Sequence, residues 1–321
     1  MRVIAPGRLH FGFVNLSLSH SRLYGAVGAA IDGPHTVVEA TPAETIDCED
    51  PAVAEYAERS CAALDLPGVK IHVESQLPRH SGLGSGTQLA LATLRATAGC
   101  YDRSVDVREH APGLGRGGRS GVGVAAFETG GFILDGGHPT ARFTTERPAD
   151  GTWRVPPVTA RHEIPPDWRF LLVIPDAETG RNGAAEDESM RSVVERADPA
   201  IADRIAGLVL RRVLPAIVDG RAEAFGDAIA ELGRLNGAWY ADEQGGVYRP
   251  PVGEIVDQLD TAASVYGAGQ SSWGPIVYGV TDTQNADLAA EAGRNALDAS
   301  GYDGQILVVA GHNSGVTVES R

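Results

Sequence analysis

Lysine is almost absent from this sequence, because Lys70 is the one lysine among 27 basic residues. The glycine-rich stretches contain no lysine, which excludes a phosphate loop of the Walker A type. Any anion site must therefore be built from arginine side chains and backbone N–H groups. Arginine suits this task because its planar guanidinium binds two phosphate oxygens at once.

Cysteine and long apolar runs are also scarce. The three cysteines, Cys48, Cys61 and Cys100, form no CxxC pair, which argues against a zinc site and favours a reducing compartment. No apolar stretch reaches 18 residues and the N-terminus has no signal-peptide pattern, so we expect a cytoplasmic protein without a membrane span. The net charge of −15 argues against binding to nucleic acid or to anionic membranes.

The 321 residues are enough for two domains, which we place at 1–160 and 166–321. The first half alternates predicted strands with glycine-rich interruptions and a few helices. A proline- and arginine-rich stretch over 144–166 is the best candidate for a linker. In the second half the order of strands and helices predicts an antiparallel sheet with helices packed on one face, and hence an α+β protein.

The stretch "LPRHSGLGSGTQLALA" places three glycines, Gly82, Gly84 and Gly86, between a predicted strand and a predicted helix. Small residues let a ligand approach the backbone, and the start of a helix offers N–H groups without partners. Ser85 and Thr87 add hydroxyl groups in the same turn. The stretch predicts a phosphate-binding loop; the alternative is a helix cap joined to a flexible turn.

Two further glycine-rich stretches, "GLGRGGRSGVG" and "GAGQSSWGP", contribute polar side chains. The first carries Arg116, Arg119 and Ser120, and the second carries Gln270, Ser271, Ser272 and Trp273. Either stretch alone is typical of a surface turn. Three glycine-rich loops in one chain, each flanked by regular structure, favour a phosphate ligand.

These motifs resemble those of the GHMP kinase superfamily. "APGRLHFG", "PRHSGLGSGTQLA" and "GAGQSSWGPIVYG" are similar to its three motifs in order and spacing. The resemblance implies a two-domain fold, with an N-terminal domain like the second domain of ribosomal protein S5 and a ferredoxin-like C-terminal domain. Several of these kinases carry an aspartate as catalytic base where "RSGVG" has Gly123. Loss of such a base costs roughly 10²–10⁴-fold in rate, so the chain resembles a phosphate-ester-binding enzyme that does not transfer the phosphoryl group.

Within the superfamily the chain resembles the β-ribofuranosylaminobenzene 5′-phosphate synthases of methanopterin biosynthesis. "GRGGRSGVGVAAFETGGFILDGGH" and "QSSWG" are similar to that branch, whereas "ETGRNGAAEDE" matches it only loosely, at Arg181 and Glu186. The resemblance implies a decarboxylating transfer from 5-phosphoribosyl 1-diphosphate to 4-aminobenzoate or 4-hydroxybenzoate, with Mg²⁺. A homodimer is compatible with the superfamily.

The resemblance also implies roles for single residues. Gly82 to Gln88, with Arg116 and Arg119, would hold the diphosphate, and Arg8, His10 and the loop Gln270 to Ser272 would hold the 5′-phosphate. Trp273, Trp239, Tyr240 and Phe11 would form an aromatic slot for the benzoate. Mg²⁺ would be held by Ser85, Thr87 and Glu128.

Asp135 is a further catalytic candidate, as a carboxylate paired with His138; the alternative is an aspartate that closes a turn. Two rival functions stay open at this point. One is an ATP-dependent small-molecule kinase that uses another base. The other is a non-catalytic sensor of a nucleotide or a sugar phosphate.

Overall fold

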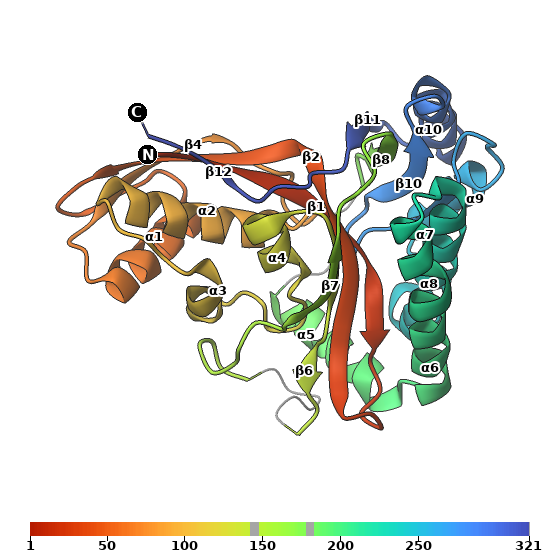
Figure 1. Cartoon of the computed structure of the whole chain (residues 1–321), viewed down its shortest axis with the longest axis horizontal. Helices are drawn as coiled ribbons and strands as arrows, with labels where there is room; N and C mark the ends of the chain where they lie inside the picture. The colour runs from red at the N-terminus through yellow and green to blue at the C-terminus, as the bar shows by residue number, and fades with distance from the viewer. Residues whose placement is uncertain (142–147, 178–182, 321) are drawn as a thin grey trace.

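The computed structural model describes residues 1–141, 148–177 and 183–320, and of residues 183–186 it describes the backbone alone. Two sheets organise the described chain (Figure 1). Among the described residues no helix is both long and apolar enough to cross a membrane.

The first sheet is built on a long antiparallel hairpin. Its strands are β1 (Arg2–Asn15), β2 (Arg22–Pro42), β3 (Ile46–Asp47), β4 (Val69–Ser75), β5 (Phe132–Asp135), β6 (His138–Pro139), β7 (Val158–His162) and β12 (Thr317–Glu319). Their order is β12-β1-β2-β4-β3, with β5 and β6 paired to β2 and with β7 paired to β5. The register of β1 and β2 shifts between His10 and Gly12, where β1 passes the glycine loops.

Helices α1 (Pro51–Leu64), α2 (Ser85–Cys100), α3 (Val107–His110) and α4 (Val122–Thr129) pack under this sheet, and the 3₁₀ turn η1 (Ala111–Leu114) follows α3 (Figure 1). Helix α2 is made almost entirely of small and apolar residues and is buried along most of its length. A helix of this kind lies between a sheet and other helices, because no side of it is polar enough to face water. Its N-terminus is thereby fixed beside Arg8, in the middle of β1.

The second sheet is fully antiparallel, in the order β11-β8-β10-β9. Its strands are β8 (Trp168–Pro175), β9 (Gly267–Gln270), β10 (Val277–Asp282) and β11 (Gly304–Ala310). Its helices are α5 (Gly183–Arg196), α6 (Pro199–Leu208), α7 (Leu214–Val218), α8 (Ala222–Gln244), α9 (Val252–Leu259) and α10 (Ala286–Ser300). Leu171 and Val173 of β8 pack with α9 and α10, as the alternation of apolar residues predicts.

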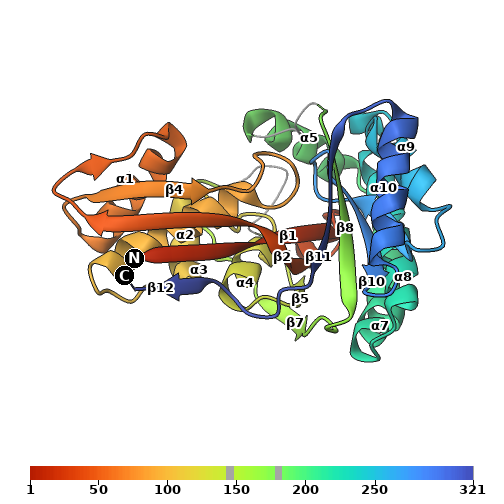
Figure 2. The same cartoon turned by 90° about the horizontal axis from the view of Figure 1, so that it is seen from above.

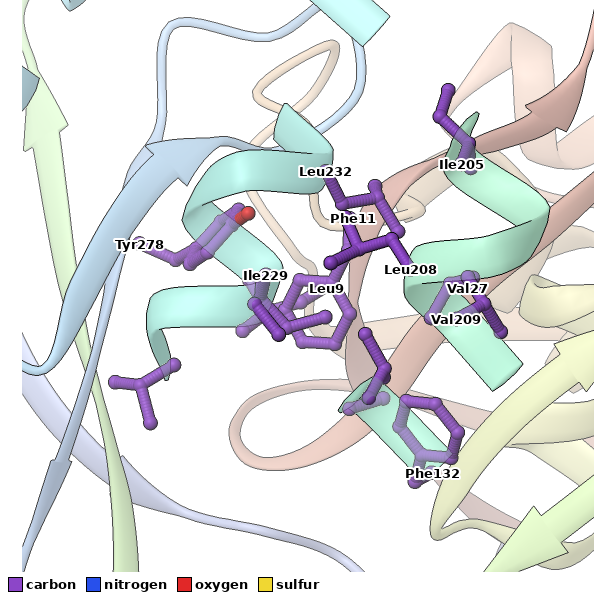
Figure 3. Packing of buried hydrophobic residues seen from close by; sticks show 14 of the residues in the cluster. Leu9, Phe11, Val27, Phe132, Ile205, Leu208, Val209, Ile229, Leu232 and Tyr278 are labelled. Atoms are coloured by element: carbon purple, nitrogen blue, oxygen red, sulfur yellow. The ribbon is translucent and has the colours of Figure 1, made fainter. Parts of the chain in front are cut away.

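The other face of the second sheet packs against the first sheet. Phe170 of β8 and Tyr278 of β10 contact Phe11 of β1, with ring centroids 6.4 and 5.0 Å from that of Phe11. Figure 3 shows this cluster, in which Leu9, Phe11, Val27 and Phe132 meet side chains of α6, of the π-helical turn η2 (Val209–Val213) and of α8. One continuous core therefore fixes the two sheets relative to each other.

The structure corrects two expectations about the chain. The stretch expected to be a linker contains β7, which pairs with β5 in the first sheet. Strand β12 pairs with β1, so the range 166–321 includes a strand of the first sheet, and both termini lie at the same end (Figure 2). Between α6 and α7 the helix continues through a π-helical turn, η2 (Val209–Val213), just before Pro215.

Candidate active site

A cleft of about 570 Å³ opens where the glycine loops meet. It is lined by Arg8, His10, Phe13, Ala52, Tyr56, Gln76, Arg79, His80, Gly82, Gly84, Ser85, Gly86, Thr87, Leu89, Gly115, Arg116, Gly117, Gly118, Arg119, Ser120, Asp187, Ser272, Trp273 and Gly274. Most of the residues that the sequence singled out are therefore gathered in one place.

The loop before α2 is shaped by left-handed glycines. Gly82 and Gly84 have φ angles of +105° and +82°, which side-chain-bearing residues rarely adopt. A β-carbon at Gly82 would overlap the carbonyl oxygen of Ser271. Gly84 caps α2 without any side-chain hydrogen bond to the first turn. The first N–H groups of a 16-residue helix are thus directed to the cleft, together with the positive end of its dipole.

Hydrogen bonds join β1 to two of the glycine loops, the loop before α2 and the loop after β9. Ser271 Oγ donates to the carbonyl oxygen of Gly82 at 2.7 Å and accepts from the N–H of His10 at 3.1 Å. The N–H of Arg8 donates to the carbonyl oxygen of Leu83 at 3.0 Å. Ser271 is fully buried and lines neither the cleft nor the smaller cavity described below. Its role in the structure is to hold β1, the loop before α2 and the loop after β9 in register.

Arginine side chains dominate the charge of the cleft. Arg116 lies over the backbone of Gly86, donates to the hydroxyl of Tyr56 and places its guanidinium carbon 5.2 Å from the centre of that ring. Arg8 donates to the carbonyl oxygen of Gly82, and Arg119 pairs with Asp187.

The balance of charge in the cleft opposes that of the whole chain. Among the described lining residues there are four arginines, Arg8, Arg79, Arg116 and Arg119, and one carboxylate, Asp187. The chain as a whole carries −15. Because exposed like charges repel, such a concentration of arginines in an acidic protein indicates a ligand with several negative charges.

His10 lies at the floor of the cleft in a buried position. Burial, and to a lesser degree the charge of Arg8, lowers its pKa to about 3. The imidazole is therefore neutral at physiological pH and adds no charge to the cleft. Its ring packs edge-on against Phe13, with centroids 4.9 Å apart.

Two residues expected to be catalytic lie behind the cleft and line neither cavity. Gln88 is fully buried, and its amide nitrogen donates to the carbonyl oxygen of Gly123 at 2.9 Å. The buried carboxylate of Asp135 accepts hydrogen bonds from the N–H groups of Gly121 and Gly137 and from Ser120 Oγ. Asp135 therefore closes a turn, which was the alternative to a catalytic role. Burial raises its pKa to about 6. Both side chains position the loops.

The expected metal ligand Glu128 is committed elsewhere. Its carboxylate forms a two-pronged ion pair with Arg108, with contacts of 2.6 and 3.0 Å to Oε2, and it does not line the cleft. Ser85 and Thr87 do line it. Within the described part of the chain no group of three or more His, Cys, Asp or Glu side chains could hold a metal ion.

Asp187 is a cleft residue that the sequence did not single out. It belongs to the acidic run "EDESMR", which reads as a solvated start of a helix, yet α5 brings it against Arg119. Arg181 lies outside the described residues, and so does the side chain of Glu186. The signal for Asp187 was its place inside the loosely matching stretch "ETGRNGAAEDE".

Gly123 faces the first turn of α2. A β-carbon there would lie 3.2 Å from Thr87 Cγ2 and 3.6 Å from Thr87 Oγ1. A side chain at this position would therefore point to the hydroxyl of Thr87 at the edge of the cleft. The loop 82–87 and Arg116 together form what we call the phosphate cradle. With glycine at 123 this cradle has no carboxylate at this point.

A smaller cavity of about 50 Å³ adjoins the cleft and shares His10, Phe13, Ser272 and Trp273 with it. It is lined in addition by Phe11, Gly12, Gly233, Asn236, Gly237, Tyr240, Gln244, Val247, Tyr248 and Gln270. Tyr240 and Trp273 pack edge-to-face in its wall, 4.6 Å between centroids. Of the four aromatic residues expected to form a slot, Phe11, Tyr240 and Trp273 line this cavity, whereas Trp239 donates to the carbonyl oxygen of Asp198.

Comparison with known proteins accords with this geometry. The family model described as "GHMP kinases N terminal domain" matches residues 51–131, and "GHMP kinases C terminal" matches residues 213–299. A beta-ribofuranosylphenol 5′-phosphate synthase of Methanothermobacter thermautotrophicus is 33% identical, over 97% of this chain and 96% of that protein. The chain belongs to this synthase family of the GHMP kinase superfamily.

Further comparisons support the same family and the same fold. The protein of that name in Archaeoglobus fulgidus is 32% identical, over 99% of each chain. Among solved structures, L. major mevalonate kinase in complex with R-mevalonate superposes with a TM-score of 0.68, at 16% identity over 98% of this chain and 97% of that chain. At that identity the likeness concerns the fold alone. The expected superfamily, fold and synthase branch are thus confirmed.

Proposed function

We propose that this protein joins C1 of ribose 5-phosphate to an aromatic ring and releases CO2, with 5-phosphoribosyl 1-diphosphate as donor and 4-hydroxybenzoate as acceptor. The ring carbon that carries the carboxylate forms a bond to ribose C1. The bond from C1 to the diphosphate oxygen breaks, and its electron pair leaves with diphosphate. The bond to the carboxyl carbon then breaks, its electron pair restores the aromatic ring, and CO2 departs.

The observation that carries this proposal is the pairing of two cavities: an arginine-rich glycine cradle with Gly123 beside Thr87, and an adjoining aromatic cavity. A diphosphate ester fits the first, and a flat ring fits the second. The full-length relatives are named for a ribofuranosylphenol phosphate. That name favours 4-hydroxybenzoate over 4-aminobenzoate as the acceptor.

The diphosphate would lie on the first turn of α2, between Gly84 and Thr87, with Arg116 above it. Preorganised donors aimed at a leaving group stabilise the charge that grows in the transition state. Each N–H or guanidinium bond to a charged oxygen contributes about 1.5–3 kcal/mol. Arg8, which lies against Gly84, and Arg119 would hold the 5′-phosphate in the same cleft.

Mg²⁺ fits this site as a companion of the diphosphate. The ion usually keeps several waters and takes one or two protein ligands plus substrate phosphates, and Ser85, Thr87 and Asp187 are the oxygen donors available in the cleft. When bound, Mg²⁺ would neutralise part of the charge of the leaving group. Asp187 takes the place that the sequence gave to Glu128.

The acceptor needs neither a base nor an electron sink from the protein. The para oxygen of 4-hydroxybenzoate pushes electrons to the carbon that attacks, and the reaction removes no proton from the ring. Neutral His10, between the two cavities, leaves room for a carboxylate without binding it as an ion pair. Weak binding is useful there because the same group must leave as CO2.

Product analysis tests this proposal. The protein is incubated with 5-phosphoribosyl 1-diphosphate, Mg²⁺ and either 4-hydroxybenzoate or 4-aminobenzoate, and the products are identified by mass spectrometry and proton NMR. A ribosylated phenol phosphate without the carboxyl group, in the β configuration, is expected. A product that keeps the carboxyl group, or a phosphorylated compound formed only with ATP, would overturn the proposal. A cytoplasmic location and a homodimer stay predictions, to be checked by cell fractionation and light scattering.

A further inference from the structure

A tyrosine in the wall of the smaller cavity has a buried hydroxyl whose hydrogen-bonding capacity the described residues do not satisfy. Tyr248 lines this cavity, and its hydroxyl is buried. Among the described residues none forms a hydrogen bond with that hydroxyl. A buried hydroxyl without a partner costs about 1–3 kcal/mol, so such a group in a cavity wall indicates a ligand that supplies the missing bond.

Gly233 shows where this hydroxyl lies. Gly233 lines the cavity, and a β-carbon on it would be 3.2 Å from the oxygen of Tyr248. The hydroxyl therefore sits at the wall formed by α8. Residues His10, Phe13, Ser272 and Trp273 form the opposite end, which is shared with the cleft. The cavity thus runs from the phosphate cradle to the hydroxyl of Tyr248.

Tyr278 provides an internal comparison. Its hydroxyl is also buried without a partner among the described residues, and it lies 3.7 Å from the same β-carbon position of Gly233. Tyr278 does not line the cavity. Of the two hydroxyls, only that of Tyr248 therefore belongs to a side chain that lines the cavity.

The volume of the cavity limits what can enter it. Its volume of about 50 Å³ has room for roughly four water molecules, so ribose phosphate must stay in the cleft. An acceptor ring with its carboxyl-bearing carbon at the shared end would place its para substituent at the wall of Tyr248. That orientation brings the reacting carbon next to the donor sugar.

We propose that the hydroxyl of Tyr248 binds the para substituent of the acceptor and so sets the orientation and the specificity of the acceptor site. This inference rests on the proposed function. Burial raises the pKa of Tyr248 to about 12, so the group stays a hydrogen-bond donor at neutral pH. As the ring attacks, the para oxygen gives electron density to the ring, so this bond serves to bind and orient the acceptor. Tyr248 is a positioning residue for the ring and takes no proton in the reaction.

The test compares Tyr248→Phe with Tyr278→Phe and with Tyr302→Phe, the last at an exposed position. The KM for 4-hydroxybenzoate and the inhibition constants of benzoate and 4-methylbenzoate are measured for each variant. Benzoate and 4-methylbenzoate lack a para hydroxyl, so they report on the aromatic cavity alone. Tyr248→Phe is expected to raise the KM about tenfold or more and to leave the two inhibition constants within twofold. The other two variants keep the wild-type pattern.

An equal rise in the KM and in both inhibition constants for Tyr248→Phe would overturn the inference, since it would mean a distorted cavity. An unchanged KM would overturn it as well. Gly233→Ala is a second probe, because its methyl group would fill the space beside the hydroxyl; the expected result is weaker binding of 4-hydroxybenzoate. Failure of the proposed function would look different, since wild-type protein would then release no CO2 from any benzoate.

Discussion

The hydroxyl of Ser271 donates to the carbonyl oxygen of Gly82 at 2.7 Å, across 189 positions of the sequence. Ser271 Oγ also accepts a hydrogen bond from the N–H of His10, so one buried serine joins three segments that are distant in the chain. Gly82 in turn has no room for a side chain, because a β-carbon would overlap the carbonyl of Ser271. The shape of the phosphate cradle therefore depends on a residue that no ligand in the cleft would touch.

Replacing this serine is expected to loosen the cradle. In Ser271→Ala the N–H of His10 and the carbonyl of Gly82 both lose a buried partner, which lowers the free energy of unfolding by about 1–3 kcal/mol. The KM for 5-phosphoribosyl 1-diphosphate should rise at least fivefold. Steady-state kinetics and urea unfolding measure the two effects. The control is Ser75→Ala, whose exposed hydroxyl bonds to the carbonyl of His35; equal effects in both variants would contradict the role of Ser271.

Gly123→Asp is expected to abolish most of the synthase activity, by tenfold or more in kcat/KM. The new side chain would start 3.2 Å from Thr87 Cγ2 and would bring a negative charge to the place proposed for the diphosphate. Gly113→Asp adds the same charge at an exposed glycine where a β-carbon meets nothing within 4 Å, and it should stay near wild type. Full activity of Gly123→Asp would show that the diphosphate lies elsewhere.

The dependence of the reaction rate on Mg²⁺ distinguishes the roles of two carboxylates, Asp187 and Glu128. Asp187→Asn is expected to raise the Mg²⁺ concentration for half-maximal rate several-fold, because it removes the one carboxylate among the described cleft residues. Glu128→Gln breaks the ion pair with Arg108, so it should lower the melting temperature and leave the Mg²⁺ requirement unchanged. Titrations of initial rate against Mg²⁺ decide. A shift in Glu128→Gln alone would restore the ligand set inferred from the sequence.

Burial of His10 predicts a stability loss in acid. In the folded protein the pKa of His10 is lowered from 6.5 to about 3. Below pH 6.5 the unfolded chain therefore binds a proton at this histidine that the folded chain does not bind. Stability from this group is complete above pH 6.5 and falls as pH falls toward 3. At pH 5 the loss is about 2 kcal/mol.

The comparison that isolates this effect is wild type against His10→Gln, by urea unfolding between pH 7 and 5. The difference in unfolding free energy should shrink by about that 2 kcal/mol, because the variant has no group to protonate at this position. His72→Gln, at an exposed site, is the control and should run parallel to wild type. A parallel course for His10→Gln would mean that the imidazole is not excluded from water.

Much of the fold could be predicted from local sequence, and the reasons are visible in particular elements. Helix α2 is signalled by its apolar composition and by the glycines before it, and β8 by the run "WRFLLVIP". Strands β7 and β12 escaped because each is short and is stabilised by a distant partner, β5 and β1. Pairing across the chain leaves little trace in a short stretch of sequence.

The candidate site also contains residues that the sequence could predict and residues that it could not. Glycines and arginines of the cradle could be found because their residue types state their chemistry. Gln88 and Glu128 were misplaced because a sequence shows that a side chain is polar, and does not show whether it faces a ligand or the carbonyl of Gly123 and the guanidinium of Arg108. Tyr248 was missed for the converse reason, since an unused hydroxyl is visible only once its surroundings are known.

The most direct measurement of the central claim is the stoichiometry of CO2 and diphosphate. Wild-type protein is supplied with 5-phosphoribosyl 1-diphosphate, Mg²⁺ and carboxyl-labelled 4-hydroxybenzoate, with ATP in a parallel reaction. Equal amounts of labelled CO2 and diphosphate, independent of ATP, are the predicted result. Absence of labelled CO2 together with consumption of ATP would contradict it and would return the chain to the kinases of its superfamily.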